Sequence, residues 1–242
     1  MRRARQNQQS RALKSKARVH AATSPMDELL GQVAQYYSKK VLTYGATPLG
    51  VDWSCVPTQE MRFVQLLKVC EFDVPITLND VGCGYGALLA FIAKRYRRKT
   101  IGYLGVDLSV EMIAQARKRW QRRWGECALT MFQVGCSGFR LADYAVASGI
   151  FNVKLNQPTD LWEQMIAQTL SDMHATSQRG FAVNFLAPMP DGSRHIPELY
   201  CVPPAVWSCY CQQTLGAEVE LIDGYGLREY TLMVRKASRS AG

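Results

Sequence analysis

The sequence of 242 residues predicts an α/β fold in which a mostly parallel sheet carries helices on both faces. One observation is the order strand, glycine turn, helix, supplied in turn by residues 76–78, the run from Asp80 to Gly86 and residues 87–98. Another is the next apolar run, residues 102–106, which ends in an acidic residue, Asp107. Later apolar runs alternate with amphipathic helical segments, as βαβ units require. The carboxyl ends of parallel strands share one edge of a sheet, so we expect a ligand there.

Residues 25–70 predict an N-terminal helical cap. Ser24 can cap the first helix, Pro25 suits its first position, and a nearby acid, Asp27, favours the positive helix end. Apolar residues at helical spacing form one face of this helix, and a second helix is predicted at 58–69. Neither helix belongs to the strand and helix alternation, so we expect both to cover the ligand site.

The second half of the chain completes the predicted core, which we assign to residues 71–236 with a flexible tail at 237–242. Apolar runs predict five further strands, at 129–134, 144–147, 180–186, 219–223 and 229–234. Amphipathic spacing predicts two further helices, at 158–174 and 203–215. The loop between the fifth strand and its helix, 187–202, is long enough to shape a binding site.

The net charge of +9 comes mainly from the first residues of the chain. Residues 1–26 hold seven Lys or Arg and no acid, whereas the other 22 basic and 20 acidic residues nearly cancel. We predict a basic disordered arm at residues 1–24, because it lacks aromatics and apolar periodicity. Two alternatives remain: an arm that contacts nucleic acid or an anionic substrate, and an organelle transit peptide. The arm has no apolar h-region, which argues against a secretory signal.

The eight cysteines are scattered through segments that look like core, and Cys83 lies inside the glycine turn. This placement favours free thiols in a reducing compartment, so we predict a cytoplasmic protein. The only close pair, Cys209 and Cys211, has poor spacing for zinc, and we predict no metal. No apolar run approaches the ~18 residues that a membrane span needs.

The glycine turn and Asp107 point to a bound adenosine. Glycines allow a tight turn and close approach of a nucleoside to the backbone, and an acid ending the second strand can accept both ribose hydroxyls. Gly82, Gly84 and Ala87 also fit the dinucleotide pattern G-x-G-x-x-G/A, which leaves a nicotinamide cofactor as an alternative. Asp80 argues against it, because an acid there would repel a pyrophosphate but could pair with a cationic amino acid.

At these positions the sequence resembles the class I S-adenosylmethionine-dependent methyltransferases, whose first motif is D/E-x-G-x-G-x-G. Asp80, Gly82, Gly84 and Gly86 match the motif, and Asp107 matches the ribose-binding acid of the family. The resemblance implies a seven-stranded, mostly parallel Rossmann-like sheet with an antiparallel last strand. It also implies S-adenosyl-L-methionine as cofactor and S-adenosyl-L-homocysteine as product.

The sequence further resembles a bacterial subgroup of this family over most of residues 36–235. The matching runs are Gly50-Val51-Asp52-Trp53, the pair Gln59 and Arg62, Ser148-Gly149-Ile150-Phe151-Asn152, Asn184-Phe185-Leu186 and Arg228-Glu229-Tyr230-Thr231. In the family, the segment after the fourth strand normally faces the methyl donor and acceptor. The subgroup resemblance implies no general substrate.

We predict that the cofactor is bound by Asp80, Gly82, Cys83, Gly84, Gly86, Asp107, Leu108, Cys136, Ser137, Ser148, Arg62 and Tyr37. No carboxylate follows the third strand, so adenine would be held by backbone groups, Ser137 or Phe139. The Arg62 guanidinium can grip the cofactor carboxylate in a fork, or form a salt bridge instead. Tyr37, with Tyr36 and Trp53, can attract the sulfonium or simply pack in the core.

A general base is needed only when the acceptor is a hydroxyl or a protonated amine. His195 in the long loop is the candidate base, with an ordinary exposed residue as the alternative reading. Asn152 and Tyr200 are candidates to orient the acceptor. We therefore predict methyl transfer to oxygen or nitrogen of a small molecule. The alternatives are an RNA or protein methyltransferase that uses the basic arm, and a regulatory protein that binds the cofactor without turnover.

Overall fold

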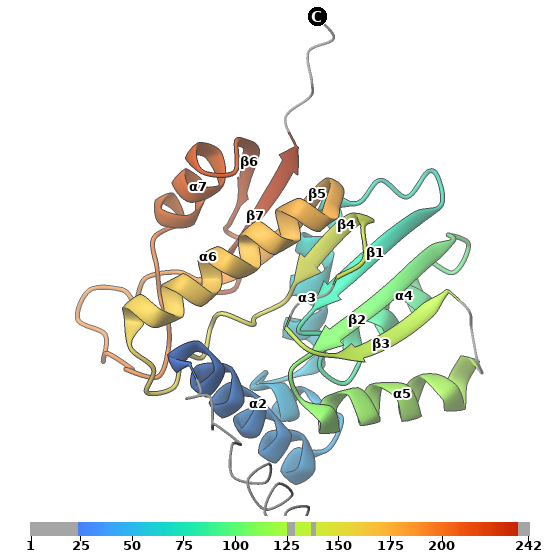
Figure 1. Ribbon diagram of the computed structural model, residues 1–242, viewed down its shortest axis with the longest axis horizontal. Coiled ribbons are helices and arrows are strands. Elements are labelled where there is room, and N and C mark those ends of the chain that lie inside the picture. Colours follow the sequence, from blue (N-terminus) through green and yellow to red (C-terminus); the bar gives the residue numbers. More distant parts are fainter. Residues whose placement is uncertain (1–23, 125–128, 137–138, 237–242) are drawn as a thin grey trace, which may run out of the picture.

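Seven strands form one sheet in the computed structural model, which describes residues 24–124, 129–136 and 139–236 (Figure 1). They are β1 (Ile76–Val81), β2 (Ile101–Asp107), β3 (Thr130–Val134), β4 (Ala142–Ala147), β5 (Ser177–Leu186), β6 (Ala217–Ile222) and β7 (Glu229–Lys236). Their order across the sheet is β3-β2-β1-β4-β5-β7-β6. The strands run in one direction except for β7, which is antiparallel to both of its neighbours, β5 and β6. The predicted fold class is thereby confirmed, last antiparallel strand included.

Some predictions fall on residues outside the described ranges. One is the basic arm predicted at 1–24, of which residues 1–23 lie outside, together with its alternative as a transit peptide. The others are the cofactor contact of Ser137 and the tail at 237–242. All three stay predictions.

Helices cover both faces of the sheet. They are α2 (Pro25–Tyr44), α3 (Val56–Leu66), α4 (Ala87–Arg95), α5 (Val110–Trp124), α6 (Thr159–Thr176) and α7 (Pro204–Gln213), with 3₁₀ turns η1 (Pro48–Val51) and η2 (Leu67–Val69). One core cluster joins α2, α6 and α7 to one face, and another joins α3 and α4 to the opposite face. Among the described helices, none combines the length and the apolar character that crossing a bilayer demands.

The start of α2 follows the predicted capping chemistry. The Asp27 N–H donates to Ser24 Oγ at 3.1 Å, and the Ser24 N–H donates back to Asp27 Oδ2 at 3.3 Å. This reciprocal capping box satisfies backbone groups that a helix end leaves unpaired. Pro25 lies in the first turn, where its missing N–H costs nothing. The cap therefore fixes where α2 begins, next to the carboxyl edge of the sheet.

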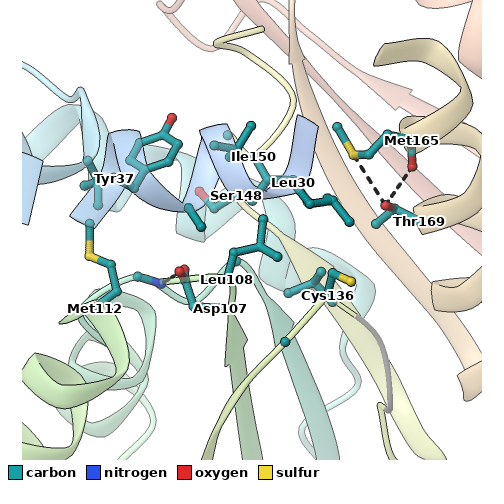
Figure 2. Close-up of a pocket in the computed structure, with 18 of the residues that line it drawn as sticks. Leu30, Tyr37, Asp107, Leu108, Met112, Cys136, Ser148, Ile150, Met165 and Thr169 are labelled. Atoms are coloured by element: carbon teal, nitrogen blue, oxygen red, sulfur yellow. Dashed lines mark hydrogen bonds between the residues drawn. The ribbon is translucent and has the colours of Figure 1, made fainter. Parts of the chain in front are cut away.

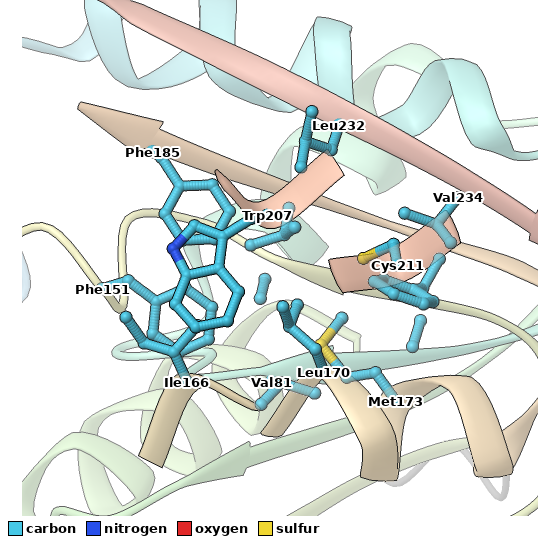
Figure 3. Close-up of a cluster of buried hydrophobic side chains, with 14 of the residues drawn as sticks. Val81, Phe151, Ile166, Leu170, Met173, Phe185, Trp207, Cys211, Leu232 and Val234 are labelled. Atoms are coloured by element: carbon cyan, nitrogen blue, oxygen red, sulfur yellow. The ribbon is translucent and has the colours of Figure 1, made fainter. Parts of the chain in front are cut away.

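Strand residues alternate between the two core clusters, as the period of two in a strand requires. Along β7, Leu232 and Val234 pack with α6 and α7, whereas Met233 packs on the opposite face. The α6 and α7 side ends in an aromatic stack, where the Phe185 ring centroid lies 5.3 Å from that of Phe151 and 6.1 Å from that of Trp207 (Figure 3). This end of the sheet is tightly closed.

Candidate active site

The glycine turn after β1 adopts backbone geometry that favours glycine. Gly82, Gly84 and Gly86 have φ values of 71°, 53° and 77°. The Gly82 and Cys83 N–H groups both donate to the Val106 carbonyl, at 2.8 and 3.0 Å, which ties the turn to β2. A Cβ at Gly82 would lie 2.1 Å from Ile150 Cγ2, so no side chain fits there. The turn thus leaves backbone exposed to whatever lies above it.

Asp107, at the end of β2, is oriented by two backbone donors. Its Oδ2 accepts the Gly84 N–H at 2.8 Å, and its Oδ1 accepts the Ser109 N–H at 2.9 Å. Burial raises the pKa of the Asp107 carboxyl to about 6, although these two hydrogen bonds lower it. Near neutral pH the group is therefore an anion held in one orientation at the edge of the sheet.

Asp80, at the end of β1, is buried below the glycine turn. The Tyr103 hydroxyl donates to Asp80 Oδ2. Burial raises the pKa of the Asp80 carboxyl to about 7; the Tyr103 hydrogen bond lowers it and the nearby charge of Asp107 raises it. A cation beside Asp80 would offset the cost of burying its carboxylate and would weaken the repulsion between the carboxylates of Asp80 and Asp107.

A cavity opens over the carboxyl ends of β1, β2 and β4 (Figure 2). Its lining includes Asp107, Leu108 and Cys136 from the β2 and β3 side, and Tyr37 from α2. Figure 2 shows Leu30 and Tyr37 reaching in from α2, and Met165 and Thr169 from α6. The cavity is therefore enclosed by the cap helix as well as by the core.

A second, smaller cavity lies on the other side of the glycine turn. Asp80, Cys83 and Gln59 line it. Five residues line both cavities: Val51, Trp53, Gly82, Gly84 and Ser148. The two cavities therefore share a wall formed by the glycine turn, Trp53 and the start of the turn after β4.

Most of the predicted cofactor contacts meet at these cavities. The ones that line a cavity are Tyr37, Asp80, Gly82, Cys83, Gly84, Asp107, Leu108, Cys136 and Ser148. Gly86 lies below the lining, where its N–H donates to the Cys83 carbonyl at 3.0 Å, so it shapes the turn from beneath. Ser148 Oγ is buried and has no hydrogen-bond partner among the described residues, which leaves it available to a ligand.

Arg62 forms a salt bridge, the alternative role that the sequence left open for it. Its Nε and Nη2 donate to the two oxygens of Glu229 at 2.7 and 2.6 Å, and its Nη1 donates to the Thr58 carbonyl at 2.8 Å. The forked edge of the guanidinium is thus occupied by a protein carboxylate, and the salt bridge is buried. Arg62 is also absent from the described lining of both cavities. Its contact with the cofactor carboxylate stays a prediction.

The three candidate catalytic residues also lie outside the described lining of both cavities. His195 is exposed on the loop between β5 and α7. Tyr200 is buried, donates its hydroxyl to Glu163 Oε1 at 2.9 Å, and gives its backbone N–H to the Asn152 carbonyl at 2.9 Å. Asn152 is 3% exposed, and both polar atoms of its amide have no partner in the described structure. Tyr200 and Asn152 are therefore neighbours, and His195 stands apart.

Sequence reasoning missed the apolar part of the large cavity. Lining residues that it did not assign to the site are Leu29, Leu30, Val33, Ala34, Val51, Val81, Met112, Gly135, Trp162, Met165 and Thr169. The signal was present for α2, because Leu30 and Tyr37 are seven residues apart and share one helix face. The sequence predicted that this helix covers the ligand site, but periodicity alone does not tell which residues of the face line a cavity.

An anion at the end of β2, a glycine turn and a cavity at the carboxyl edge define a nucleoside-binding enzyme of the class I methyltransferase type. A family model described as a methyltransferase domain matches residues 79–172. The Mycobacterium tuberculosis protein Rv1506c, whose name assigns it provisionally to the methyltransferases, is 38% identical over 172 residues, covering 71% of this chain and 100% of that protein. The chain belongs to the methyltransferase family, and the resemblance found in the sequence is confirmed.

Solved structures share the fold. The magnesium protoporphyrin IX methyltransferase of Synechocystis PCC 6803, solved with bound S-adenosylmethionine, matches with a TM-score of 0.61 and 15% identity over 90% of this chain and 100% of that chain. An O-methyltransferase family protein of Burkholderia thailandensis matches with a TM-score of 0.60 and 14% identity, over 92% of this chain and 74% of that chain. At these identities the likeness speaks for the Rossmann-like fold.

Proposed function

We propose that this enzyme transfers the methyl group of S-adenosylmethionine to an oxygen or nitrogen atom of a small-molecule acceptor, leaving S-adenosylhomocysteine. The observation that carries the proposal is the large cavity, which has Asp107 on one side and apolar side chains of α2 and α6 on the other (Figure 2). The cofactor, when bound, supplies a methyl group activated by a sulfonium. The chain supplies binding, orientation and exclusion of water, which provide much of the rate in such a transfer.

The residues present fit this cofactor. Each Asp107 oxygen accepts one backbone N–H and keeps a further lone pair, so the carboxylate can also accept the two ribose hydroxyls. Asp80 is placed to pair with an ammonium group, which would relieve its burial as an anion. Gly82 and Gly84 line the cavity with backbone, which lets a ligand approach the main chain closely. Leu108 and Cys136 flank the part of the cavity beyond Asp107, where adenine would lie.

The acceptor is proposed to occupy the side of the cavity between α2 and α6. Leu30, Ile150 and Met165 line it with apolar atoms. The Thr169 hydroxyl already donates to the Met165 carbonyl at 2.8 Å within its own helix. These contacts favour an acceptor with an apolar body. The magnesium protoporphyrin IX methyltransferase of Synechocystis PCC 6803, which has the same fold and is named for a small-molecule acceptor, is consistent with this.

Asn152 is our candidate for orienting the acceptor. A buried amide without partners costs free energy, so a water molecule or a ligand group is expected against it. Tyr200 supports Asn152 from behind through its backbone N–H. His195 as a general base requires the loop that carries it to move toward the cavity. We also propose a cytoplasmic location, which the free cysteines of the described chain favour.

The test is a calorimetric titration of the purified protein with S-adenosylhomocysteine and, in parallel, with NADH. We expect micromolar binding of S-adenosylhomocysteine that is lost in Asp107→Ala, and no binding of NADH. Asp223→Ala is the matched control, because Asp223 is exposed and lies beyond β6 at the far edge of the sheet. Binding of NADH alone would overturn the proposal.

The acceptor class is then tested with methyl-labelled cofactor. Panels of phenols and amines with apolar bodies are offered alongside charged, polar analogues of similar size. Transfer confined to the apolar panels supports the proposed acceptor side. Transfer only to RNA or to protein, dependent on residues 1–24, would contradict it.

A further inference from the structure

A buried chain of hydrogen bonds joins four separate elements next to the shared wall of the two cavities. Glu229 on β7 accepts two bonds from Arg62 on α3 and a third, at 2.7 Å, from Asn184 Nδ2 on β5. Asn184 Oδ1 in turn accepts the Gly149 N–H, just after β4, at 2.8 Å. The chain of contacts Arg62–Glu229–Asn184–Gly149, called the relay below, therefore ends on the backbone of the cavity wall.

Stability alone is a poor explanation for burying the charged residues of the relay. Arg62 is 6% exposed, Glu229 is 3% exposed and Asn184 is fully buried. Taking two charges out of water is costly, and well-packed apolar side chains often stabilise a fold as well or better. A fully satisfied buried network does, however, fix one geometry, because each donor and acceptor has a single partner arrangement. The relay is thus suited to setting a position.

Trp53, which is part of the shared wall, lies between Arg62 of the relay and Gly149. The Arg62 guanidinium carbon lies 3.5 Å from the centroid of the Trp53 ring, in cation–π contact. On the wall side, a Cβ at Gly149 would lie 2.2 Å from Trp53 Cζ2. The indole therefore fits only because residue 149 is glycine, which also has a φ of 73°. Arg62 acts on the wall from two directions, through Trp53 and through Glu229.

The wall reaches the glycine turn directly. Ile150 Cγ2 occupies the space that a side chain at Gly82 would need. Trp53 and Ser148 line both cavities, and Asp80 lines the small one. Asp107, Leu108 and Cys136 line the large cavity and not the small one. Within this turn, Ser148 lines both cavities, whereas Gly149 and Ile150 line only the large one. A shift of the Ser148–Ile150 turn would therefore move the wall beside Asp80 through Ser148 and the wall beside the glycine turn through Ile150. Asp107, Leu108 and Cys136 lie on other segments of the chain.

We infer that Arg62, Glu229 and Asn184 are positioning residues that hold Trp53 and the Ser148–Ile150 turn against the glycine turn, and so set the affinity for the amino-acid half of the cofactor. This inference rests on the proposed function for the identity of that cofactor. It also gives one physical reason for four sequence runs, around Trp53, Gly149, Asn184 and Glu229, that the sheet alone does not require.

The test compares two ligands that share a nucleoside. S-adenosylhomocysteine and adenosine are titrated into wild type and Glu229→Gln, in which the amide turns a donor toward Arg62 or Asn184. We expect the Kd of S-adenosylhomocysteine to rise roughly tenfold or more, since hydrogen bonds to a charged group are lost, while that of adenosine stays within about twofold. Glu71→Gln is the matched control, because it breaks an exposed ion pair with Arg179 on another part of the surface.

A second variant separates positioning from stability. Arg62→Met combined with Glu229→Met replaces the ion pair by apolar side chains of similar length and leaves Asn184 Nδ2 without its partner, so we expect an unfolding midpoint above that of either single variant. The loss of affinity for S-adenosylhomocysteine relative to adenosine should persist in it. Arg62→Lys, which keeps the charge but not the fork, should restore only part of the affinity.

Unchanged affinity for S-adenosylhomocysteine in folded variants would overturn the inference, and so would an equal loss for both ligands. Failure of wild type to bind S-adenosylhomocysteine would instead sink the proposed cofactor, and the inference with it. Wild-type binding that the variants leave intact refutes the positioning role alone.

Discussion

The carboxyl edge of the sheet ends in two contrasting ways. At β5 and β7 it is filled by paired aromatic residues, Phe185 and Tyr230, whose rings stack 5.6 Å apart and continue to Trp207 (Figure 3). At β1 and β2 the strands lead instead into glycines and the carboxylate Asp107, and a cavity opens. Strands of one sheet support both arrangements, so the size of the side chains at the strand ends decides whether the edge is closed for stability or open for binding.

The largest effect is expected in the closed region. Trp207 is 5% exposed and stacks on Phe185, so Trp207→Ala should lower the free energy of unfolding by about 3–5 kcal/mol. Urea denaturation measures this, and calorimetry on the folded fraction should find S-adenosylhomocysteine affinity within about twofold of wild type. The neighbouring exposed Val206→Ala is the control. Loss of binding in folded Trp207→Ala would break the separation of the two regions.

The open region should respond in the opposite manner. Gly82→Ala adds a Cβ that would lie 2.1 Å from Ile150 Cγ2, so the shared wall must move. Overpacking of this kind costs about 1–3 kcal/mol, and we expect S-adenosylhomocysteine to bind roughly ten- to a hundredfold more weakly. Gly192→Ala is a matched control, with a similar φ of 76° but no heavy atom within 4 Å of the added Cβ. Equal effects of both variants would mean that backbone strain, rather than the wall, limits binding.

Proton uptake by Asp80 gives the open region a pH dependence. Its carboxyl has a pKa of about 7, so it is largely neutral at about pH 5.5 and anionic at about pH 7.5. In the proposed complex the anion pairs with the cofactor ammonium, and the affinity for S-adenosylhomocysteine should therefore rise with pH by at most about tenfold per unit. Asp80→Asn should flatten this rise, leaving the smaller contribution of Asp107, whose pKa is about 6. A slope unchanged in Asp80→Asn would assign the titration to another group.

The raised pKa of Asp80 also affects the stability of the protein without ligand. The Asp80 pKa is raised above the ordinary value of about 3.9, so the folded state binds more protons than the unfolded state between those two values. The stabilising contribution of Asp80 is fully present below about pH 4 and is lost as the pH rises through about 7. Ligand binding and folding thus depend on this carboxyl with opposite signs.

The smallest effect is expected at the cap. Ser24→Ala removes the side-chain half of the capping box of α2 and should cost about 1 kcal/mol of unfolding free energy, measured by urea denaturation. Thr43→Ala, whose hydroxyl bonds to the Lys39 carbonyl inside the same helix, is the control and should cost less. A loss of several kcal/mol in Ser24→Ala would show that α2 contributes to the closed region more than its contacts indicate.

Local sequence was sufficient to predict the strands and the glycine turn with its two acids, whereas the antiparallel last strand followed from the resemblance to the methyltransferases. The strands and the turn depend on residues within a few positions, such as alternation along β7 or the spacing from Gly82 to Gly86. The cap of α2 at Ser24 was predictable for the same reason, because a capping box spans three residues.

The contacts of long side chains were not predictable in this way. Arg62 and Glu229 are 167 residues apart, and nothing near Arg62 in sequence announces a carboxylate partner rather than a ligand. Tyr200 looked like a loop residue, but its ring is buried beside Trp207 because the loop folds back onto β4 and β5. The five subgroup runs were visible as a pattern, and only their arrangement in space suggests the common role proposed for them.

Cys83 gives the glycine turn a chemical property of its own. Its thiol is buried against Gly105, and burial raises its pKa well above the ordinary value. Oxidants and alkylating agents attack thiolates that they can reach. The Cys83 sulfur atom is protected because it is buried and because its raised pKa keeps it protonated. Thiol damage should therefore begin at exposed positions such as Cys55 and Cys209, and the loop that binds the nucleoside should outlast them.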